Sequence, residues 1–363
     1  MTWPEQRARF PVLDRHAYLN AGTFGPLART TLTAMAELRA WEGEHGRGGR
    51  RYFDAMLERR ERVRELFAAE IGAPAEQVAL TDSTTQGVHV VVTGLGLDHG
   101  DEVVTTDAEH FGLTGPLLGS GARLRIAGVR GAPAAAVFEL IRGQVTPRTR
   151  LIALSAVSWL DGTIFPWREL REATNVPVLV DGAQSVGALA VDATAADFYT
   201  VSGQKWLCGP DSTGALYVRE PDTLRPRLIA YPSAETYDIA EGTWEPKAGA
   251  RRFDTTFTPA TSLAGLEAAL ADLPDGRFAR ARELTAQCRE LLRGHGHEVV
   301  SGAEQGTLVS FRFAGDTAEA AASLYERGVI VRELAGTGLL RASVGWWNDE
   351  SDLQRLVEGL AAL

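Results

Sequence analysis

Seven short apolar segments follow one another along the middle of the chain, and they restrict the fold more than any other feature. Helix-like segments lie between several of them, for example at 87–96 and 134–144. This alternation is typical of a mostly parallel sheet covered by helices on both faces, an α/β fold. The predicted strands are VALTD at 78–82, EVVTTD at 102–107, RLRIAG at 123–128, LIALSAVS at 151–158, VPVLVDG at 176–182, FYTVSG at 198–203 and GALYVRE at 214–220.

The two ends of the chain differ from this middle part. Loop and turn signals in the first 20 residues predict an extended arm. Helical periodicity fills 28–70 and is interrupted by GRGGRR at 46–51, where glycine favours a helix end. Helix-like and strand-like segments alternate again after about residue 255. We therefore expect an arm at 1–20 that packs with the small domain, a large domain at 21–255 and a small C-terminal α+β domain at 256–363.

Composition excludes several classes of function. A formal net charge of −10 over 363 residues argues against a basic nucleic-acid surface. No apolar run approaches the ~20 residues of a membrane span, and the first 20 residues lack the apolar core of a signal peptide. Cys208 and Cys288 form neither a disulfide framework nor a zinc motif. We expect a cytoplasmic protein without metal, nucleic-acid or membrane partners.

An acid and a lysine stand at the ends of two neighbouring predicted strands. Asp181 ends VPVLVD, and Lys205 lies in the turn SGQKWLCGP after the next strand. Ligands of open α/β sheets bind outside the carboxyl ends of strands, so both side chains can face one ligand. Pyridoxal phosphate needs this pair, because the lysine forms the covalent link and the acid keeps the pyridine nitrogen protonated. The alternative is a turn-capping acid and a surface lysine.

Neighbouring motifs support a phosphate-bearing ring. Thr81, Ser83, Thr84 and Thr85 lie between a predicted strand and a predicted helix. Hydroxyl and backbone N–H groups at a helix N-terminus bind phosphate, although Ser and Thr are also common helix caps. His110 ends EVVTTDAEH, where an imidazole can stack on a planar ring or serve a structural role.

Taken in order, these motifs resemble the class V aminotransferase-like branch of the fold type I pyridoxal-phosphate enzymes. The resemblance extends over essentially the whole chain. It implies a large domain with a mostly parallel seven-stranded sheet and a small C-terminal α+β domain. The motifs are YLNAGTFGPL, TDSTTQGV, DAEHFGL, SAVSWLDGTIFPW, VDGAQSVG, SGQKWLCGP and LLRASVGWW.

The resemblance implies a role for each cofactor-binding residue. Lys205 is similar to the lysine that holds the cofactor covalently, and Asp181 to the partner of the pyridine nitrogen. His110 resembles the histidine that stacks on the ring and relays protons. Gln184 is similar to the glutamine that contacts the 3′-oxygen of the ring. The residues expected around the phosphate are Thr84, Thr85, Ser202 and Gln204.

Two expectations concern the edge of the phosphate site. The family often has histidine where this chain has Gln204, which can donate a hydrogen bond but carries no charge. In the family a second subunit completes this site, which implies a homodimer with a shared active site. The segment RRFDTTFTPATS at 251–262 aligns loosely with that region, so we expect Thr256 or Thr258 there. The loops at 46–51 and 234–249 are further candidates for the subunit junction.

The expected substrate is a small amino acid. Arg341 in LLRASVG resembles the arginine that pairs with the substrate carboxylate, a role that suits a bidentate guanidinium. The C–S lyases of the family also carry an arginine nine residues earlier, here Arg332. Two guanidiniums suit the two carboxylates of a cystine-like substrate, although a surface strand residue is an equal alternative for Arg332. Thr23 and Trp159 are the remaining expected substrate contacts.

The predicted reaction depends on the position of the cysteines in the chain. A desulfurase needs a nucleophilic cysteine on a mobile loop, and the matching segment 328–345 has none. Cys208 is better explained as a small buried apolar residue. We therefore predict β-elimination, in which Lys205 takes the α-proton and the C–S bond breaks to give a keto acid, ammonia and a sulfur product. Cysteine desulfurase, amino-acid epimerase and aminotransferase remain open alternatives.

Two functions that do not use pyridoxal phosphate are less favoured. A dinucleotide-binding oxidoreductase needs GxGxxG directly after its first strand, whereas GLGLDHG at 94–100 follows a helical run. A catalytically silent scaffold has no need for the intact set of site residues listed above.

Overall fold

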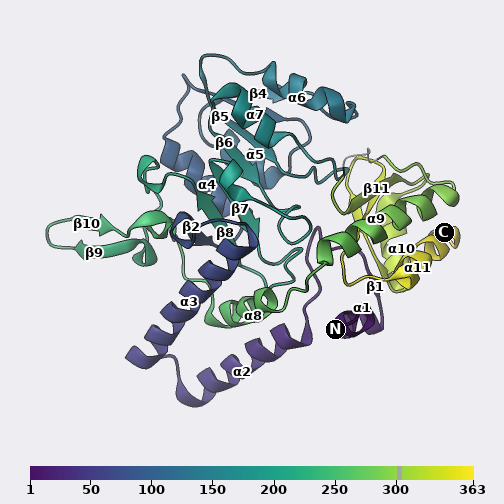
Figure 1. The fold of residues 1–363 in the computed structure, drawn as a ribbon, viewed down its shortest axis with the longest axis horizontal. Coiled ribbons are helices and arrows are strands. Elements are labelled where there is room, and N and C mark those ends of the chain that lie inside the picture. Colours follow the sequence, from purple (N-terminus) through teal and green to yellow (C-terminus); the bar gives the residue numbers. More distant parts are fainter. Residues whose placement is uncertain (301–304) are drawn as a thin grey trace.

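A computed structural model describes residues 1–300 and 305–363 (Figure 1). All seven predicted strands form one sheet, in the order β2-β8-β7-β6-β5-β3-β4. Strands β3 to β7 run parallel, and β8 runs antiparallel to both β2 and β7, so the prediction of a mostly parallel α/β sheet is confirmed. The strands are β2 Val78–Thr81, β3 Glu102–Thr106, β4 Arg123–Ala127, β5 Thr149–Ser155, β6 Val178–Asp181, β7 Phe198–Ser202 and β8 Gly214–Val218.

Helices cover both faces of this sheet (Figure 1). The predicted helices are α4, Thr84–Leu95, and α6, Ala134–Arg142. Two further helices, α5 at Phe111–Leu118 and α7 at Trp167–Thr174, were not predicted. Helix α5 contains Pro116 and two glycines, which normally disfavour a helix. It is held because Leu113 and Leu117 are fully buried beside α4.

Two long helices lie below the sheet in Figure 1. They are α2, Arg29–His45, and α3, Arg50–Glu70, and the predicted glycine-rich break at 46–49 separates them. Both pack against α8, Ala260–Ala271. Leu263, Leu266 and Leu270 of α8 belong to the same buried apolar cluster as β5 and β6. Helix α8 therefore contributes to the core beneath the sheet.

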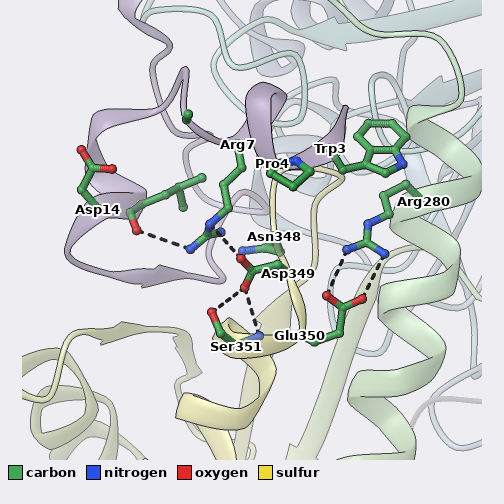
Figure 2. Close-up of a pocket in the computed structure, with 11 residues that line it drawn as sticks. Trp3, Pro4, Arg7, Asp14, Arg280, Asn348, Asp349, Glu350 and Ser351 are labelled. Atoms are coloured by element: carbon green, nitrogen blue, oxygen red, sulfur yellow. Dashed lines mark hydrogen bonds and ion pairs between the residues drawn. The ribbon is translucent and has the colours of Figure 1, made fainter. Parts of the chain in front are cut away.

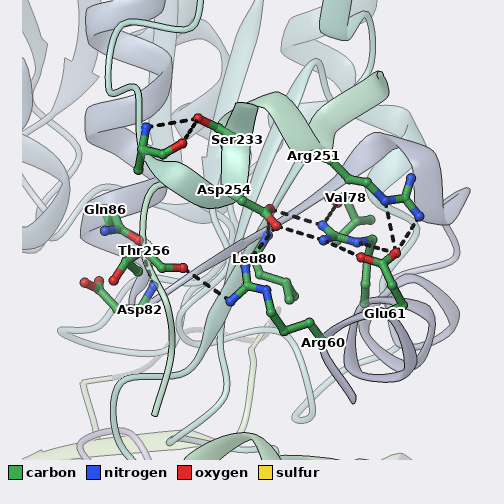
Figure 3. A network of polar contacts seen from close by, with 12 residues as sticks. Arg60, Glu61, Val78, Leu80, Asp82, Gln86, Ser233, Arg251, Asp254 and Thr256 are labelled. Carbon is green, nitrogen blue, oxygen red and sulfur yellow. Dashed lines mark hydrogen bonds and ion pairs between the residues drawn. The ribbon is translucent and has the colours of Figure 1, made fainter. Parts of the chain in front are cut away.

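A buried ionic network fixes α3 to this core (Figure 3). Asp254 accepts hydrogen bonds from Arg60 Nη2 at 2.9 Å and from Arg64 Nη2 at 2.8 Å. It also accepts the backbone N–H of Leu80 in β2 at 2.8 Å. All three charged side chains are at most 3% exposed, so the opposite charges beside each one must stabilise it in the protein interior.

The N-terminal arm is not simply extended as predicted. It forms the short helix α1, Trp3–Arg7, a 3-10 turn at Pro11–Asp14 and strand β1, Ala17–Tyr18. The Thr2 N–H donates to Glu5 and proline occupies the first turn, which are helix-start signals on too short a segment for periodicity to reveal. Strand β1 pairs in parallel with β12, Val329–Ile330.

The C-terminal strands and helices form a second layer beside the arm (Figure 1). An antiparallel sheet joins β11 Leu308–Arg312, β14 Leu339–Ser343 and β13 Arg332–Leu334, with helices α9 Arg277–Gly294, α10 Thr317–Glu326 and α11 Glu350–Ala361. Arg7 of α1 contacts Asp349 at 3.0 Å (Figure 2). Arg7 also donates to Asp352 of α11 at 2.6 Å. The division into 1–20, 21–255 and 256–363 stays a prediction.

The hairpin of β9, Ala234–Asp238, and β10, Thr243–Pro246, projects from the body of the molecule (Figure 1). Exposed aromatic side chains gather beside it, where Tyr231 contacts Tyr237, Phe257 and the half-buried Phe53. Of residues 1–300 and 305–363, no helix has the length and apolar character to cross a bilayer. In the same ranges no group of three or more potential metal ligands occurs.

Candidate active site

A cavity of about 140 Å³ opens at the carboxyl ends of β5, β6 and β7. It brings together most of the predicted site residues, although they come from five separate stretches of sequence. The predicted residues that line it are Thr84, Thr85, His110, Trp159, Asp181, Gln184, Ser202, Gln204 and Lys205. Ser83, Ser155, Val157 and Ala183 complete the lining. The position matches the rule for open α/β sheets.

Asp181 and Lys205 both line this cavity. Asp181 is the last residue of β6, is 4% exposed, and accepts the Ala183 N–H at 2.9 Å. Lys205 lies in the loop after β7. Desolvation lowers the pKa of Lys205 to about 8, and the charge of Arg341 acts in the same direction while Asp181 opposes it. More of the amine is therefore neutral near physiological pH than for an ordinary lysine, as a nucleophile or base requires.

The N-terminal segment holds the lysine loop in place. The Gly25 N–H donates to the Gln204 carbonyl oxygen at 2.8 Å. A Cβ atom on Gly25 would clash with the Lys205 carbonyl oxygen, so the two backbones meet closely only because residue 25 is glycine. Residues that are 180 positions apart in the chain thus fix the orientation of the loop that carries the amine.

The first turn of α4 forms one end of the cavity. Ser83 is the N-cap, and its Oγ accepts the Gln86 N–H at 3.2 Å. Thr84 and Thr85 follow with hydroxyl and N–H groups at the positive end of the helix dipole. Ser202 Oγ donates to Gln204 Oε1 at 3.0 Å, which leaves the Gln204 amide NH₂ as a hydrogen-bond donor. This end is suited to an anionic group such as phosphate.

His110 stands at the N-terminus of α5. Its Nδ1 accepts the Gly112 N–H at 3.0 Å, so a neutral ring carries its proton on Nε2. Desolvation lowers the pKa of His110, and the nearby charge of Lys205 lowers it further. The ring meets Trp159 edge to face, with centroids 5.2 Å apart. A neutral imidazole is therefore fixed at the wall of the cavity.

Gln184 is held at both ends of its amide. Its Nε2 donates to the Gly22 carbonyl oxygen at 2.9 Å, and its Oε1 accepts the indole N–H of Trp206 at 2.9 Å. Gln184 and Trp206 are both buried. The side chain predicted to contact the ring oxygen thus has one orientation.

Arg341 lies just beyond the lining of the cavity. It is 2% exposed on β14, and its Nη1 donates to the carbonyl oxygen of the cavity residue Trp159 at 2.8 Å. Within 1–300 and 305–363, Arg341 Nε has no hydrogen-bond partner. Desolvation lowers the pKa of Arg341 to about 9, and the charge of Arg332 adds to the effect. A buried guanidinium with a free donor calls for an anion.

The other predicted residues lie farther out. Arg332 is exposed on β13, opposite Arg341. Thr23 donates to Asn20 Oδ1 at 2.9 Å in the turn that contains Gly22. The Thr256 carbonyl oxygen accepts Arg60 Nη1 at 3.3 Å, outside the cavity of its own chain (Figure 3). The roles assigned to these residues, and to the cavity residues, stay predictions.

Two polar residues near the cavity were missed. Glu109 accepts Thr106 Oγ1 at 2.8 Å, Ser155 N–H at 2.9 Å and Ser155 Oγ at 2.5 Å. Burial raises the pKa of Glu109 to about 7, and the charge of Asp181 contributes. Ser343 follows Arg341 by two residues, so it shares a face of β14, and its buried Oγ lacks a partner in the described ranges. That period of two was the available signal for Ser343.

Both cysteines are buried. Cys208 is 4% exposed, and its thiol donates to the Trp206 carbonyl oxygen at 3.8 Å. Cys288 is 1% exposed inside α9. Desolvation raises the pKa of both thiols, that of Cys288 to about 12. Neither is a reactive thiolate in this structure.

Known proteins resemble this chain over nearly its whole length. Residues 17–356 match the model of the class-V aminotransferases. Isopenicillin N epimerase of Streptomyces clavuligerus is 30% identical over 99% of this chain and 98% of its own length. A probable cysteine desulfurase of Mycobacterium leprae is 31% identical over 98% of this chain and 94% of its own length.

Solved structures are also similar to this chain over nearly its whole length. The cystine C–S lyase C-DES, in complex with its reaction product cysteine persulfide, aligns with a TM-score of 0.89 and 27% identity, over 97% of this chain and 99% of that one. A variant of C-DES with glycine covalently linked to its pyridoxal-phosphate cofactor aligns with a TM-score of 0.90 and 26% identity, over 98% of both chains. The predicted resemblance, fold class and pyridoxal-phosphate cofactor are confirmed.

Proposed function

Because the chain belongs to the class-V aminotransferase family, we propose that it is a pyridoxal-phosphate-dependent lyase that cleaves the C–S bond of a cystine-type amino acid. The products are a keto acid, ammonia and a sulfur compound. One observation carries the proposal: Arg332 and Arg341 stand opposite each other next to the Lys205 cavity, in a chain whose two cysteines are both buried.

The residues of the cavity fit the cofactor. Lys205 supplies an amine of lowered pKa for the covalent link, and buried Asp181 supplies a carboxylate for the pyridine nitrogen. The start of α4, with Thr84 and Thr85, supplies donors for the phosphate. When bound, the cofactor withdraws electrons from the substrate α-carbon and makes its C–H bond acidic.

Lys205 is the base that we assign to the reaction. Substrate binding frees its amine, and Nζ then takes the α-proton. A pKa of about 8 suits this step, because the free amine is partly neutral at pH 7 to 8 yet basic enough to hold the proton. His110 presents a neutral imidazole with a proton on Nε2, which can donate a hydrogen bond at the same cavity. Trp159, edge-on to His110, limits its movement.

Arg341 and Arg332 orient the substrate. Arg341 Nε and Ser343 Oγ are buried donors without partners in the described ranges, and they suit the α-carboxylate. Arg332, opposite Arg341 and exposed, suits a second carboxylate at the far end of a cystine-like molecule. Two carboxylates on one substrate would thus be neutralised by the two guanidiniums.

The cysteines argue against a persulfide on the enzyme. A persulfide mechanism needs a thiolate that reaches the substrate sulfur. Cys208 is buried with a raised pKa, and Cys288 lies in the separate apolar cluster under α9. The sulfur therefore leaves with the product. Free thiols in both cysteines also suit the reducing cytoplasm that we predict.

Epimerisation is the second candidate. The observation that favours it is the 30% identity with isopenicillin N epimerase over nearly the full length of both chains. An epimerase returns the α-proton to the opposite face and keeps the C–S bond intact. Lys205 and His110 both line the cavity, so two groups for proton transfer are present in this chain.

Product analysis tests the proposal. The cofactor-loaded protein is incubated with L-cystine and, separately, with L-cysteine, and pyruvate, ammonia and alanine are quantified. Pyruvate and ammonia in equal amounts support elimination. Alanine with persulfide would instead indicate a desulfurase. Loss of optical activity without either product would favour the epimerase, and no change with any substrate would remove the C–S lyase assignment.

A homodimer with a shared active site belongs to the same proposal. The projecting β9–β10 hairpin and the exposed aromatic side chains of Tyr231, Tyr237 and Phe257, which pack with half-buried Phe53, offer surfaces for a second subunit. Thr256 lies next to this cluster and away from its own cavity. Mixing an inactive Lys205→Ala chain with an inactive Thr256→Ala chain should restore activity if each site uses residues of both subunits.

A further inference from the structure

Trp206, which directly follows the cavity lysine, has a buried indole N–H that points at the amide of Gln184. We propose that Trp206 is a positioning residue: it fixes the Gln184 amide so that an N–H donor, rather than the amide oxygen, faces the ring oxygen of the bound cofactor. The inference rests on the proposed function for the identity of the ring. The orientation of the amide itself follows from this chain alone.

The two partners of Gln184 determine which way its amide lies. An indole nitrogen can only donate a hydrogen bond, and a backbone carbonyl can only accept one. Trp206 Nε1 therefore requires the amide oxygen on its side, at 2.9 Å, and Gly22 O requires the amide nitrogen, also at 2.9 Å. Both contacts agree on one orientation, so the usual ambiguity between amide oxygen and nitrogen does not arise.

The reversed orientation is strongly disfavoured. It would place the amide NH₂ against the indole N–H and the amide oxygen against the Gly22 carbonyl oxygen. Gln184 is 6% exposed and Trp206 1%, so water cannot replace the lost partners. Without the indole N–H, only the contact with Gly22 would oppose the reversed orientation.

One donor of Gln184 remains after these contacts. The amide nitrogen has two protons, and the Gly22 carbonyl oxygen accepts one of them. Among the described residues no second acceptor takes the other. Because Gln184 lines the cavity, this proton is available to a bound acceptor, and a negatively charged ring oxygen is an acceptor.

The indole has little freedom to move. A Cβ atom on Gly187 would lie 2.7 Å from the Trp206 backbone carbon, so that glycine lets a neighbouring turn press against the indole-bearing residue. Trp347 packs against Trp206 with ring centroids 6.4 Å apart. The same loop therefore carries the covalent lysine and the group that sets the polarity of Gln184.

Four variants test the proposal: Trp206→Phe, Gln184→Ala, the double variant, and Trp346→Phe as a matched control. Trp346 is also buried, its indole nitrogen has no partner in the described ranges, and its ring packs on Phe10 and Trp347. The readout is the pH midpoint of the visible absorbance of the bound cofactor. A donor stabilises the deprotonated ring oxygen, so Trp206→Phe should raise this midpoint by about one pH unit, and Trp346→Phe should leave it unchanged.

The double variant separates positioning from general loosening of the site. If Trp206 acts through Gln184, Trp206→Phe should cause no further shift in the Gln184→Ala background. An equal shift in both backgrounds would overturn the proposal, and so would an unchanged midpoint in Trp206→Phe. Equal shifts in Trp206→Phe and Trp346→Phe would also overturn it.

A second measurement is independent of the reaction. In the cofactor-free protein, the indole N–H signal of Trp206 in a ¹H–¹⁵N spectrum should move upfield in Gln184→Ala, while that of Trp347 stays in place. A stationary Trp206 signal would overturn the proposed contact. If pyruvate never forms from cystine but the midpoint and the indole signal behave as expected, the lyase assignment fails and the role of Trp206 stands.

Discussion

Arg332 and Arg341 lie directly opposite each other on the antiparallel strands β13 and β14, so their side chains leave the sheet on the same face. Like charges in this position repel. The repulsion and the burial of Arg341 act together to lower the pKa of Arg341 to about 9. Carboxylates bound at the two guanidiniums relieve both effects, which is why this pair indicates a substrate with two carboxylates.

The arginine pair predicts how mutation changes the KM for substrates with one or two carboxylates. Arg332→Ala should raise the KM for L-cystine by roughly 10-fold or more, because one charge-assisted contact is lost, and should change the KM for L-cysteine little. Arg341→Ala should raise the KM for both. Steady-state kinetics on the two substrates measure this difference. Equal effects of Arg332→Ala on both substrates would show that Arg332 does not contact a second carboxylate.

The lysine assignment has a clean control, because the chain contains two lysines, Lys205 and Lys247. Lys205→Ala should lose the visible band of the bound cofactor and lower kcat by about 10² to 10⁴, since both the covalent link and the base are removed. Lys247→Ala should retain both properties. After borohydride reduction, peptide mass mapping should find the cofactor on Lys205. A label on Lys247 would contradict the assignment.

Glu109 predicts a pH-dependent stability. The pKa of Glu109 rises from 4.5 to about 7 on folding, mainly because the side chain is buried. Its contribution to stability is therefore present below about pH 4.5 and is lost as the pH rises through about 7. Glu109→Gln carries no charge at any pH. As the pH rises from 4.5 to 8, its free energy of unfolding should therefore increase relative to that of the native protein by about 3 kcal/mol.

Urea unfolding of the cofactor-free protein at pH 5 and pH 8 measures this change. Glu37→Gln, on the exposed side of α2, is the control and should show the same difference from the native protein at both pH values. A pH-independent difference for Glu109→Gln would mean that Glu109 binds no proton in this range.

The ionic network of Figure 3 predicts a large loss of stability. Asp254→Ala leaves Arg60 and Arg64 buried without their shared carboxylate, and the free energy of unfolding should fall by about 3 to 5 kcal/mol. Asp222→Ala removes an exposed ion pair with Arg252 and should cost less than about 1 kcal/mol. Chemical denaturation compares the two. Similar losses would show that burial does not strengthen the network.

Much of the sheet could be predicted because its strands are continuous apolar runs that end in polar residues. Strands β6 and β7 are buried at every position, so apart from Thr200 their residues are apolar until Asp181 and Ser202 reach the cavity. Their acid and lysine could be placed at one site for the same reason. Helix α5 could not be predicted, because Pro116 and two glycines give the segment a low helix propensity. Tertiary packing stabilises the helix instead.

Contacts between distant residues account for what the sequence did not reveal. The hydrogen bond between Gln184 and Gly22 joins positions 162 apart, and no periodicity indicates it. Glu109 precedes His110, but its burial next to Asp181 depends on the order of β3, β5 and β6 in the sheet. The helix in the arm was missed because five residues are too few to display a helical period.

The approach of Gly25 to the Lys205 loop has a consequence for how the protein matures. The turn before Gly25 also pairs with the last strand of the C-terminal layer, where Ser343 N–H donates to Leu19 O and Asn20 bridges to Ser343. The lysine loop thus acquires its final support only after the segments around Leu19 and Ser343 have both been synthesised and have met, a contact of high sequence separation. Cofactor capture should therefore follow the meeting of these two segments, so that holoenzyme content reports how many chains have finished folding.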